Sequence, residues 1–306
     1  MTMRILVTGS SGTIGTRLCE RLIGKHEFVG IDLGPNKWNE PVNKATVIGD
    51  LRDPKSLDKL GKFDLVIHLA ANARVYNLVL NPELALDNIK TTFRVLEFCR
   101  NNKIPRVMIA SSREIYGNSD NHLHPEEDVR VEMCESPYSA SKLSGEALCQ
   151  AYQRCYGLNF IILRFSNVYG MYDDSDRVIP LFIRLARQQK DLVVFGEEKA
   201  LDFTYIDDTI AGILAAIENF DAAKNNAYNI SSGKCIEIAK VAEMILAQLG
   251  KGSKIVIKGN RPGEVVKFVA DITRAKRILG FEPQTSIEEG MKKTISWYGA
   301  QSDSSR

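Results

Sequence analysis

Residues 4–15, RILVTGSSGTIG, place a short apolar run directly before three glycines with the spacing GxxGxxG. The run predicts a buried strand over 4–8, and the residues after it predict a helix over 13–23. Glycines between a strand and a helix let the backbone turn tightly and approach a pyrophosphate, whose charge is favoured at the helix N-terminus. Taken alone the string is weak evidence, because glycines often only shape a turn.

An acidic residue stands where a dinucleotide site needs one. Asp32 ends the next predicted strand, about 20 residues downstream, where a carboxylate can accept a hydrogen bond from a ribose 2′-hydroxyl. The same charge repels a 2′-phosphate, so the sequence favours NAD over NADP. After the third predicted strand comes Asp50-Leu51, where Asp50 either borders the adenine or is an ordinary loop carboxylate. We therefore predict an NAD-binding half.

Short β-rich runs alternate with amphipathic stretches of helical length, which indicates parallel strands joined by crossover helices. The expected strands are 4–8, 28–32, 46–48, 65–69, 107–111 and 160–165. The expected helices are 13–23, 82–100, 137–156, 179–189, 207–217, 239–249 and 287–298.

This pattern predicts an α/β fold, a Rossmann-type doubly wound parallel sheet with a smaller C-terminal substrate-binding lobe. The alternation becomes irregular after about residue 170. We expect residues 1–170 to form the NAD-binding domain, with a returning segment near 201–230. Residues 171–200 and 231–306 are then expected to form the smaller lobe.

Composition narrows the class of protein. The 306 residues are 44% hydrophobic and 25% charged, which is typical of a globular chain, and the formal net charge is only +2. That balance gives no support for a nucleic-acid or membrane partner. The six cysteines are scattered, with no CxxC pair, which favours reduced thiols in a cytoplasmic protein. No metal site is expected, since His122, His124, Glu126 and Glu127 fall in a Pro-containing loop.

A second group of residues indicates redox chemistry. Tyr138 and Lys142 are four residues apart in a predicted helix and therefore share a face, while Ser112 follows a predicted strand. A lysine ammonium and a nicotinium ring nearby would stabilise a tyrosine phenolate, which then exchanges the proton of a substrate hydroxyl while hydride moves. Ser112 would hydrogen-bond the same oxygen.

With these motifs in view, the chain resembles an extended short-chain dehydrogenase/reductase of the NAD-dependent nucleotide-sugar epimerase/dehydratase family. The resemblance covers nearly the whole length and its motifs occur in order. They are 9–15, Asp32, Asp50-Leu51, 68–71, Asn88, Ser111-Ser112 with Tyr116-Gly117, Tyr138 with Lys142, 163–170, 202–208 and 261–264.

The resemblance implies roles for particular residues. It implies Ser112, Tyr138 and Lys142 as the catalytic triad, and Asn167, the segment 178–180 with Val178, and Arg261 as contacts to a nucleoside diphosphate. The implied NAD contacts are Gly9, Gly12, Thr13, Ile14, Gly15, Asp32, Asp50, Leu51, Leu69, Ala70, Ala71, Asn88, Tyr138 and Lys142. A guanidinium suits diphosphate oxygens, which supports the assignment of Arg261.

Two positions depart from the family pattern. Many relatives carry an arginine aimed at the diphosphate where this chain has Leu201, and Lys199 is a possible but unequal substitute. Glu114 occupies the slot of the general base in dehydratases and decarboxylases, so it is a candidate base, or else a carboxylate satisfied by a neighbouring arginine. Arg113 occupies the acid slot of 4,6-dehydratases and cannot donate a proton there. Arg74, Arg113 and Arg164 are candidate ligands of a uronate carboxylate, or are structural.

We therefore hypothesise an NAD-dependent nucleotide-sugar 4-epimerase for a UDP-hexose or UDP-hexuronate, working through a transient 4-keto sugar. One alternative is a dehydratase or decarboxylase that uses Glu114 as base. Another is a non-catalytic NAD-binding regulator on the same fold. The helix 82–100 carries apolar stripes on two sides, which predicts a homodimer seam or a helix packed within its own fold.

Overall fold

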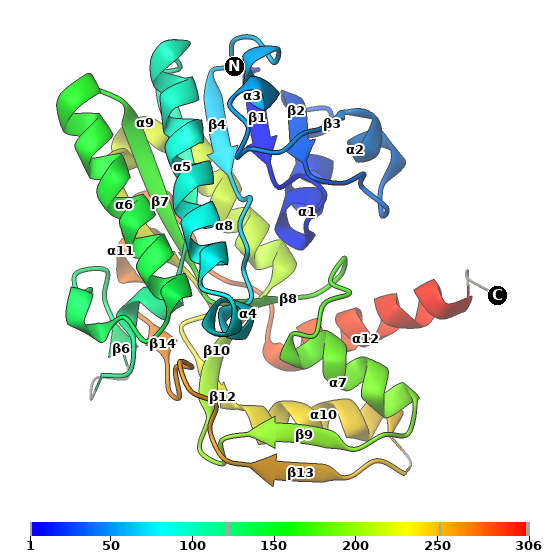
Figure 1. Ribbon diagram of the computed structural model, residues 1–306. Helices are drawn as coiled ribbons and strands as arrows, with labels where there is room; N and C mark the ends of the chain where they lie inside the picture. Colours follow the sequence, from blue (N-terminus) through cyan, green and yellow to red (C-terminus); the bar gives the residue numbers. More distant parts are fainter. Residues whose placement is uncertain (1, 120–122, 251, 304–306) are drawn as a thin grey trace.

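The computed structural model describes residues 2–119, 123–250 and 252–303. A central sheet of seven parallel strands has the order β11-β7-β5-β4-β1-β2-β3 (Figure 1). The strands are β1 (Arg4–Thr8), β2 (Glu27–Asp32), β3 (Thr46–Ile48), β4 (Leu65–His68), β5 (Arg106–Ser112), β7 (Asn159–Phe165) and β11 (Asn226–Ile230). The order changes direction between β1 and β4: β2 and β3 follow on the side of β1, and β5, β7 and β11 on the side of β4. This order confirms the predicted Rossmann-type doubly wound fold.

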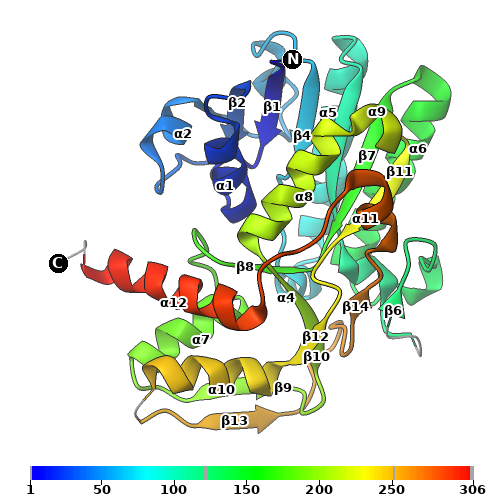
Figure 2. The same cartoon turned by 180° about the vertical axis from the view of Figure 1, so that it is seen from behind.

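Helices cover both faces of this sheet (Figures 1 and 2). The longer ones are α1 (Thr13–Leu22), α5 (Glu83–Asn101), α6 (Pro137–Tyr156) and α8 (Ile206–Glu218). Short helices in the same part of the chain are α2 (Glu40–Lys44), α3 (Lys55–Asp58), α9 (Phe220–Ala223) and α4 (Val75–Leu80), which lies beyond the carboxyl ends of the strands. On one face α5 packs against α6, and on the other α1 packs against α8. The strands β5 and β7 are buried along almost their whole length, as parallel strands covered on both faces must be.

The remaining elements lie mostly at the carboxyl edge of the sheet, below it in Figure 1. The helices are α7 (Val178–Arg187), α10 (Ile238–Leu249), α11 (Thr273–Leu279) and α12 (Ile287–Asp303), with 3-10 turns η1 (Arg113–Tyr116) and η2 (Val131–Met133). The strands are β6 (Leu123–His124), β8 (Asn167–Tyr169), β9 (Leu192–Phe195), β10 (Ala200–Tyr205), β12 (Cys235–Glu237), β13 (Ile255–Lys258) and β14 (Val269–Ala270). They form three small sheets, β12-β10-β8, β13-β9 and β14-β6.

The chain returns to the central sheet after residue 205. Here α8 joins the layer beside α1, and β11 adds to the edge of the sheet in parallel with β7. The later helix α11 packs on β11 and α8, although residues 231–306 were assigned to the smaller lobe. The predicted domain boundaries near 170, 200 and 230 stay predictions.

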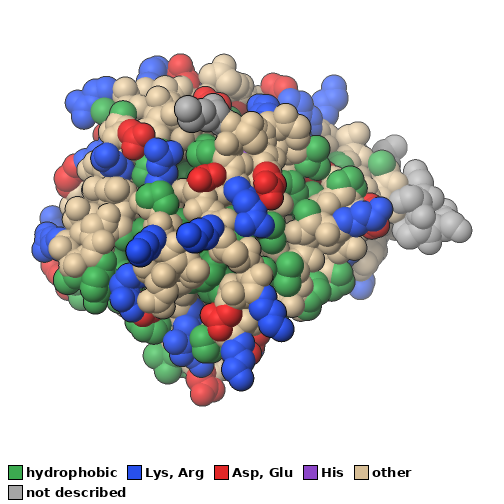
Figure 3. Space-filling view, turned by 90° about the horizontal axis from the view of Figure 1, so that it is seen from above, with side chains coloured by type: hydrophobic (Ala, Val, Ile, Leu, Met, Phe, Trp, Pro, Cys, Tyr) green, Lys and Arg blue, Asp and Glu red, His purple; other side chains and the backbone are tan. Residues whose placement is uncertain are grey.

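The surface carries charges of both signs. On the face seen in Figure 3, lysines and arginines are scattered among acidic and apolar side chains rather than gathered in one block. Within residues 2–119, 123–250 and 252–303, no helix is both long enough and apolar enough to cross a membrane.

Candidate active site

The turn between β1 and α1 is built around two glycines that no other residue replaces without strain. Gly9 has φ +73°, and a Cβ there would lie 2.7 Å from the amide nitrogen of Ala70. A Cβ on Gly15 would lie 2.0 Å from the carbonyl oxygen of Gly9. The helix α1 begins without a side-chain cap and without an acidic residue in its first turn. Its free N–H groups therefore suit a pyrophosphate, and the residues present fit NAD.

The carboxylates predicted for the adenosine end lie in different surroundings. Asp32 stands at the carboxyl end of β2, beside the glycine turn, and its Oδ2 accepts a hydrogen bond from Ser11 N at 2.9 Å. Asp50 forms an ion pair with the Arg52 guanidinium, which lowers the pKa of that carboxyl. Arg52 also contacts Asp87 at 3.0 Å. The neighbouring Leu51 is buried.

The loop after β4 forms the next part of this surface. Leu69 and Ala71 line the central cavity, whereas Ala70 lies against the glycine turn. Asn88 on α5 accepts a hydrogen bond from the backbone of Asn72 and donates to that residue's carbonyl and to Ser141. The amide of Asn88 therefore holds the loop in place instead of facing the cavity.

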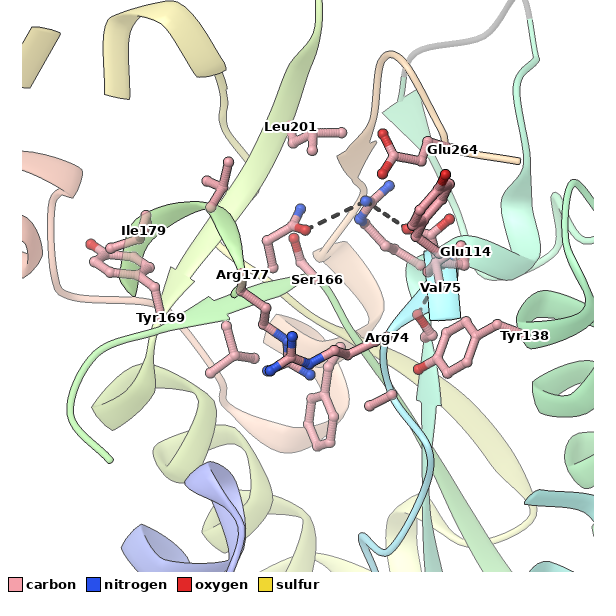
Figure 4. Close-up of a pocket in the computed structure, with 18 of the residues that line it drawn as sticks. Arg74, Val75, Glu114, Tyr138, Ser166, Tyr169, Arg177, Ile179, Leu201 and Glu264 are labelled. Atoms are coloured by element: carbon pink, nitrogen blue, oxygen red, sulfur yellow. Dashed lines mark hydrogen bonds and ion pairs between the residues drawn. The ribbon is translucent and has the colours of Figure 1, made fainter. Parts of the chain in front are cut away.

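A cavity of about 500 Å³ lies between the carboxyl edge of the central sheet and the smaller lobe. In Figure 4, Glu114, Tyr138 and Glu264 lie on one side of it and Tyr169 and Ile179 on the other. Further predicted site residues in its wall are Ile14, Arg74, Ser112, Lys142, Asn167, Val178 and Arg261. The fold thus brings residues from both halves of the chain to one space.

Tyr138 sits in the first turn of α6, which Ser136 and Ser139 cap reciprocally. Ser112 lies beside it and acts to lower the pKa of Tyr138, and the Oγ of Ser112 accepts the Glu114 backbone N–H at 3.2 Å. The Ser112 hydroxyl keeps its proton and a second lone pair for Tyr138 or a substrate oxygen. This is the geometry that a shared proton-transfer site needs.

Burial shifts the pKa values of both Lys142 and Tyr138. The Lys142 ammonium lies 5.8 Å from the centre of the Tyr138 ring and donates to Ala110 O at 2.9 Å. Burial lowers the pKa of Lys142 to about 8. Burial also raises the pKa of Tyr138, while the hydrogen bond from Ser112 and the charges of Arg177 and Arg113 oppose that rise. The sequence predicts that lysine and nicotinium lower the pKa of Tyr138. That lowering must exceed the rise in pKa that burial causes.

Arg261 lines the cavity and lies against two aromatic rings. Its guanidinium stacks on Phe195, 3.7 Å from the ring centre, and lies 5.2 Å from the ring centre of Tyr76. No carboxylate in the described residues pairs with it. Leu201 is buried in β10, and the nearby Lys199 is bound to Glu264 at 2.5 Å. Lys199 therefore does not replace the missing arginine as an unpaired cation.

Several side chains near the cavity have roles that the sequence did not show. Tyr76 and Phe195 hold Arg261, yet neither belongs to a recognised motif. Arg177, directly before Val178, lines the cavity and faces Arg74 in Figure 4. In the sequence, the signal that could have identified Arg177 is its position next to the 178–180 segment. Arg164 instead forms two hydrogen bonds with Glu146 away from the cavity.

The histidines and acidic residues considered for a metal are paired with protein groups. His124 is buried and lies 2.8 Å from Asp128, and Glu126 and Glu127 contact Arg274. His122 lies outside the described residues. In the part of the chain that the structure describes, no cluster of metal-ligating side chains is found.

The model of a protein family, NAD dependent epimerase/dehydratase, matches residues 5–231. The chain belongs to this family. It is 32% identical over 314 residues to a UDP-glucuronate 4-epimerase of Thermodesulfobacterium geofontis, with 95% of each chain covered. Membership confirms the resemblance drawn from the motifs. Because the family is NAD-dependent, NAD is the cofactor that the glycine turn 9–15 fits.

Two solved structures show how far the similarity extends in space. A UDP-glucose 4-epimerase from Thermotoga maritima with UDP-glucose superposes with a TM-score of 0.89 at 28% identity, covering 98% of this chain and 99% of the other. A dTDP-glucose 4,6-dehydratase from Streptomyces venezuelae with NAD bound gives 0.90 at 26% identity, with 98% of each chain covered. Both the epimerases and the dehydratases of the family therefore share this fold.

Proposed function

We propose that this protein is an NAD-dependent nucleotide-sugar 4-epimerase that acts on a UDP-sugar through a transient 4-keto intermediate. The observation that carries the proposal is that Ser112, Tyr138 and Lys142 line one cavity, which also contains Arg261, with the Lys142 ammonium 5.8 Å from the centre of the Tyr138 ring. The relatives named for UDP-glucose and UDP-glucuronate 4-epimerisation support this reaction and this nucleotide.

Each residue of the site has a defined task in this reaction. Tyr138 removes the proton of the sugar 4-hydroxyl and later returns it, and Ser112 donates a hydrogen bond to the same oxygen. Lys142 stabilises the phenolate form of Tyr138 by its charge. The turn 9–15 and Asp32 would hold NAD, which would supply reversible acceptance of the C4 hydride. The 4-keto sugar turns over between the two transfers, so no net redox change occurs.

The direct test is product analysis by mass spectrometry with sugar-resolving chromatography, after incubation with UDP-, dTDP-, GDP- and CDP-sugars. A new isomer of unchanged mass is expected. Loss of water or carbon dioxide would instead establish the lyase alternative with Glu114 as base. Tight binding of NAD with no turnover of any sugar would support the regulator.

We also expect Arg261→Ala to raise KM for the nucleotide sugar about 10- to 100-fold, because a charge-assisted contact to the diphosphate is lost. The value of kcat should change little, since the diphosphate is remote from C4. Steady-state kinetics measures both constants. Arg277→Ala, at an exposed position of α11, is the matched control and should leave both unchanged. An unaltered KM in Arg261→Ala would remove Arg261 from the diphosphate site.

A homodimer is proposed from the outer face of α5. Leu86 is 65% exposed and Phe93 37% exposed there, while the opposite stripe with Val95 and Phe98 is buried in the fold. A shallow hollow between α5 and α6 adjoins Leu86 and Ile89. A second copy that packs on this face would remove these side chains from water.

Leu86→Glu combined with Phe93→Glu is expected to convert the dimer to a monomer, because two charges would be buried at the seam. Light scattering coupled to size-exclusion chromatography measures the mass. Val131→Glu, at an exposed apolar residue elsewhere, should keep the dimer. A wild-type protein of monomer mass would refute the dimer.

We propose a cytoplasmic location as well. All six cysteines are free thiols, and burial raises the pKa of Cys19, Cys99 and Cys149. A chain of this kind suits a reducing compartment.

A further inference from the structure

Arg113 and Glu114 form an ion pair in the wall of the active-site cavity. Arg113 Nη2 lies 2.6 Å from Glu114 Oε1 and 3.4 Å from Asn167 Oδ1. The two residues are 7% and 6% exposed, and the Arg113 guanidinium packs 5.6 Å from the ring centre of the buried Phe268. Glu114 is also linked to the reacting centre, since its backbone N–H binds Ser112 Oγ.

This pair leaves one donor and one acceptor unused. Arg113 Nη1 and Glu114 Oε2 are both buried, and neither has a hydrogen-bond partner among the described residues. Leaving a buried polar atom unpaired costs free energy, so such atoms mark the position of a ligand group. A hydroxyl satisfies both, because it accepts from the guanidinium and donates to the carboxylate.

Several cations that line the cavity already contact protein carboxylates, and Asp176 is shared by Arg74 and Arg184. Lys199 is paired with Glu264 at 2.5 Å, and Arg74 with Asp176 at 3.2 Å. Arg177 lies 3.8 Å from Asp173. A sugar carboxylate would place a second negative charge beside Glu114, whose partner Arg113 is already paired, and two like charges close together are costly to bury. Arg261, which lacks a carboxylate partner in the described residues, is left for the diphosphate.

We propose that the Arg113–Glu114 pair binds a sugar hydroxyl and selects a neutral hexose over a hexuronate. The inference rests on the proposed 4-epimerase function and narrows its substrate class. The interpretation of Glu114 as a base is replaced by a role in specificity. The arginines considered for a uronate carboxylate are each engaged by a protein carboxylate instead.

The test compares kcat/KM for UDP-glucose and UDP-glucuronate in the NAD-loaded enzyme and in Glu114→Gln. The wild type is expected to favour UDP-glucose. In Glu114→Gln the site loses a negative charge, and one carboxylate oxygen is replaced by an NH2 donor, so kcat/KM should fall about 10-fold for UDP-glucose and rise for UDP-glucuronate. Glu132→Gln, an exposed acidic residue outside the cavity, is the matched control and should leave both values unchanged.

A second variant tests the inference independently if Glu114→Gln does not fold. Arg113→Lys keeps the charge opposite Glu114 but removes the Nη1 donor, and it should lower kcat/KM for UDP-glucose without raising that for UDP-glucuronate. A wild-type preference for UDP-glucuronate, or a ratio that neither variant changes, overturns the inference while leaving 4-epimerisation intact. No epimerisation of any UDP-sugar by the wild type would overturn the proposed function and the inference with it.

Discussion

Tyr138→Phe is expected to lower kcat by about 10²- to 10⁴-fold, the usual contribution of a positioned acid–base group. The ring stays packed at the start of α6, so the fold and the binding of NAD should be retained. Only the hydroxyl, which lies beside Ser112 in the cavity wall, is removed. Initial rates of conversion of the UDP-sugar at saturation, together with the NAD content of the purified protein, measure both effects.

Tyr156→Phe is the matched control for this substitution. It makes the same chemical change on the same helix, but its ring is 58% exposed and far along α6 from the cavity. It should leave kcat unchanged. If Tyr138→Phe kept more than about a tenth of the wild-type kcat, the role of Tyr138 in proton transfer would be refuted.

Gly15→Ala is expected to abolish the retention of NAD and to lower the free energy of unfolding by about 1–3 kcal/mol. The added Cβ would lie 2.0 Å from the carbonyl oxygen of Gly9 and 2.8 Å from Ser10 Cα, so the turn itself must move. Alanine gains only about 1 kcal/mol of helix propensity over glycine, which does not offset a backbone collision. The displaced turn then no longer presents its N–H groups to the pyrophosphate.

Urea unfolding measures the stability of Gly15→Ala, and chromatography of the supernatant after denaturation measures its bound NAD. Gly259→Ala is the control, because its Cβ would meet no atom within 4 Å and the residue lies in the smaller lobe. It should bind NAD as the wild type does. Full NAD content in Gly15→Ala would show that the cofactor does not depend on this turn.

Local patterns in the sequence predicted most of the fold. The strands 4–8 and 46–48 and the helix 137–156 match the structure residue for residue, and the other predicted elements differ by a few residues at their ends. Apolar runs, helical periodicity and capping residues are properties of neighbouring positions, which is why they can be read without the structure. The strand β11 was not predicted, because its sequence Asn-Ala-Tyr-Asn-Ile is short and half polar.

The glycine turn, Asp32 and the shared face of Tyr138 and Lys142 likewise followed from spacing along the chain. What only the tertiary structure decided is which charges remain unpaired in the cavity. Lys199 meets Glu264 across 65 positions, and Arg74 meets Asp176 across 102. These distances depend on how the crossovers bring the smaller lobe over the carboxyl edge of the sheet, and no local pattern encodes them. For that reason the sequence alone determined an NAD-binding fold with a tyrosine–lysine pair. Only the folded chain showed that Lys199 and Arg74 contact carboxylates, whereas Arg261 in the cavity has no carboxylate partner among the described residues.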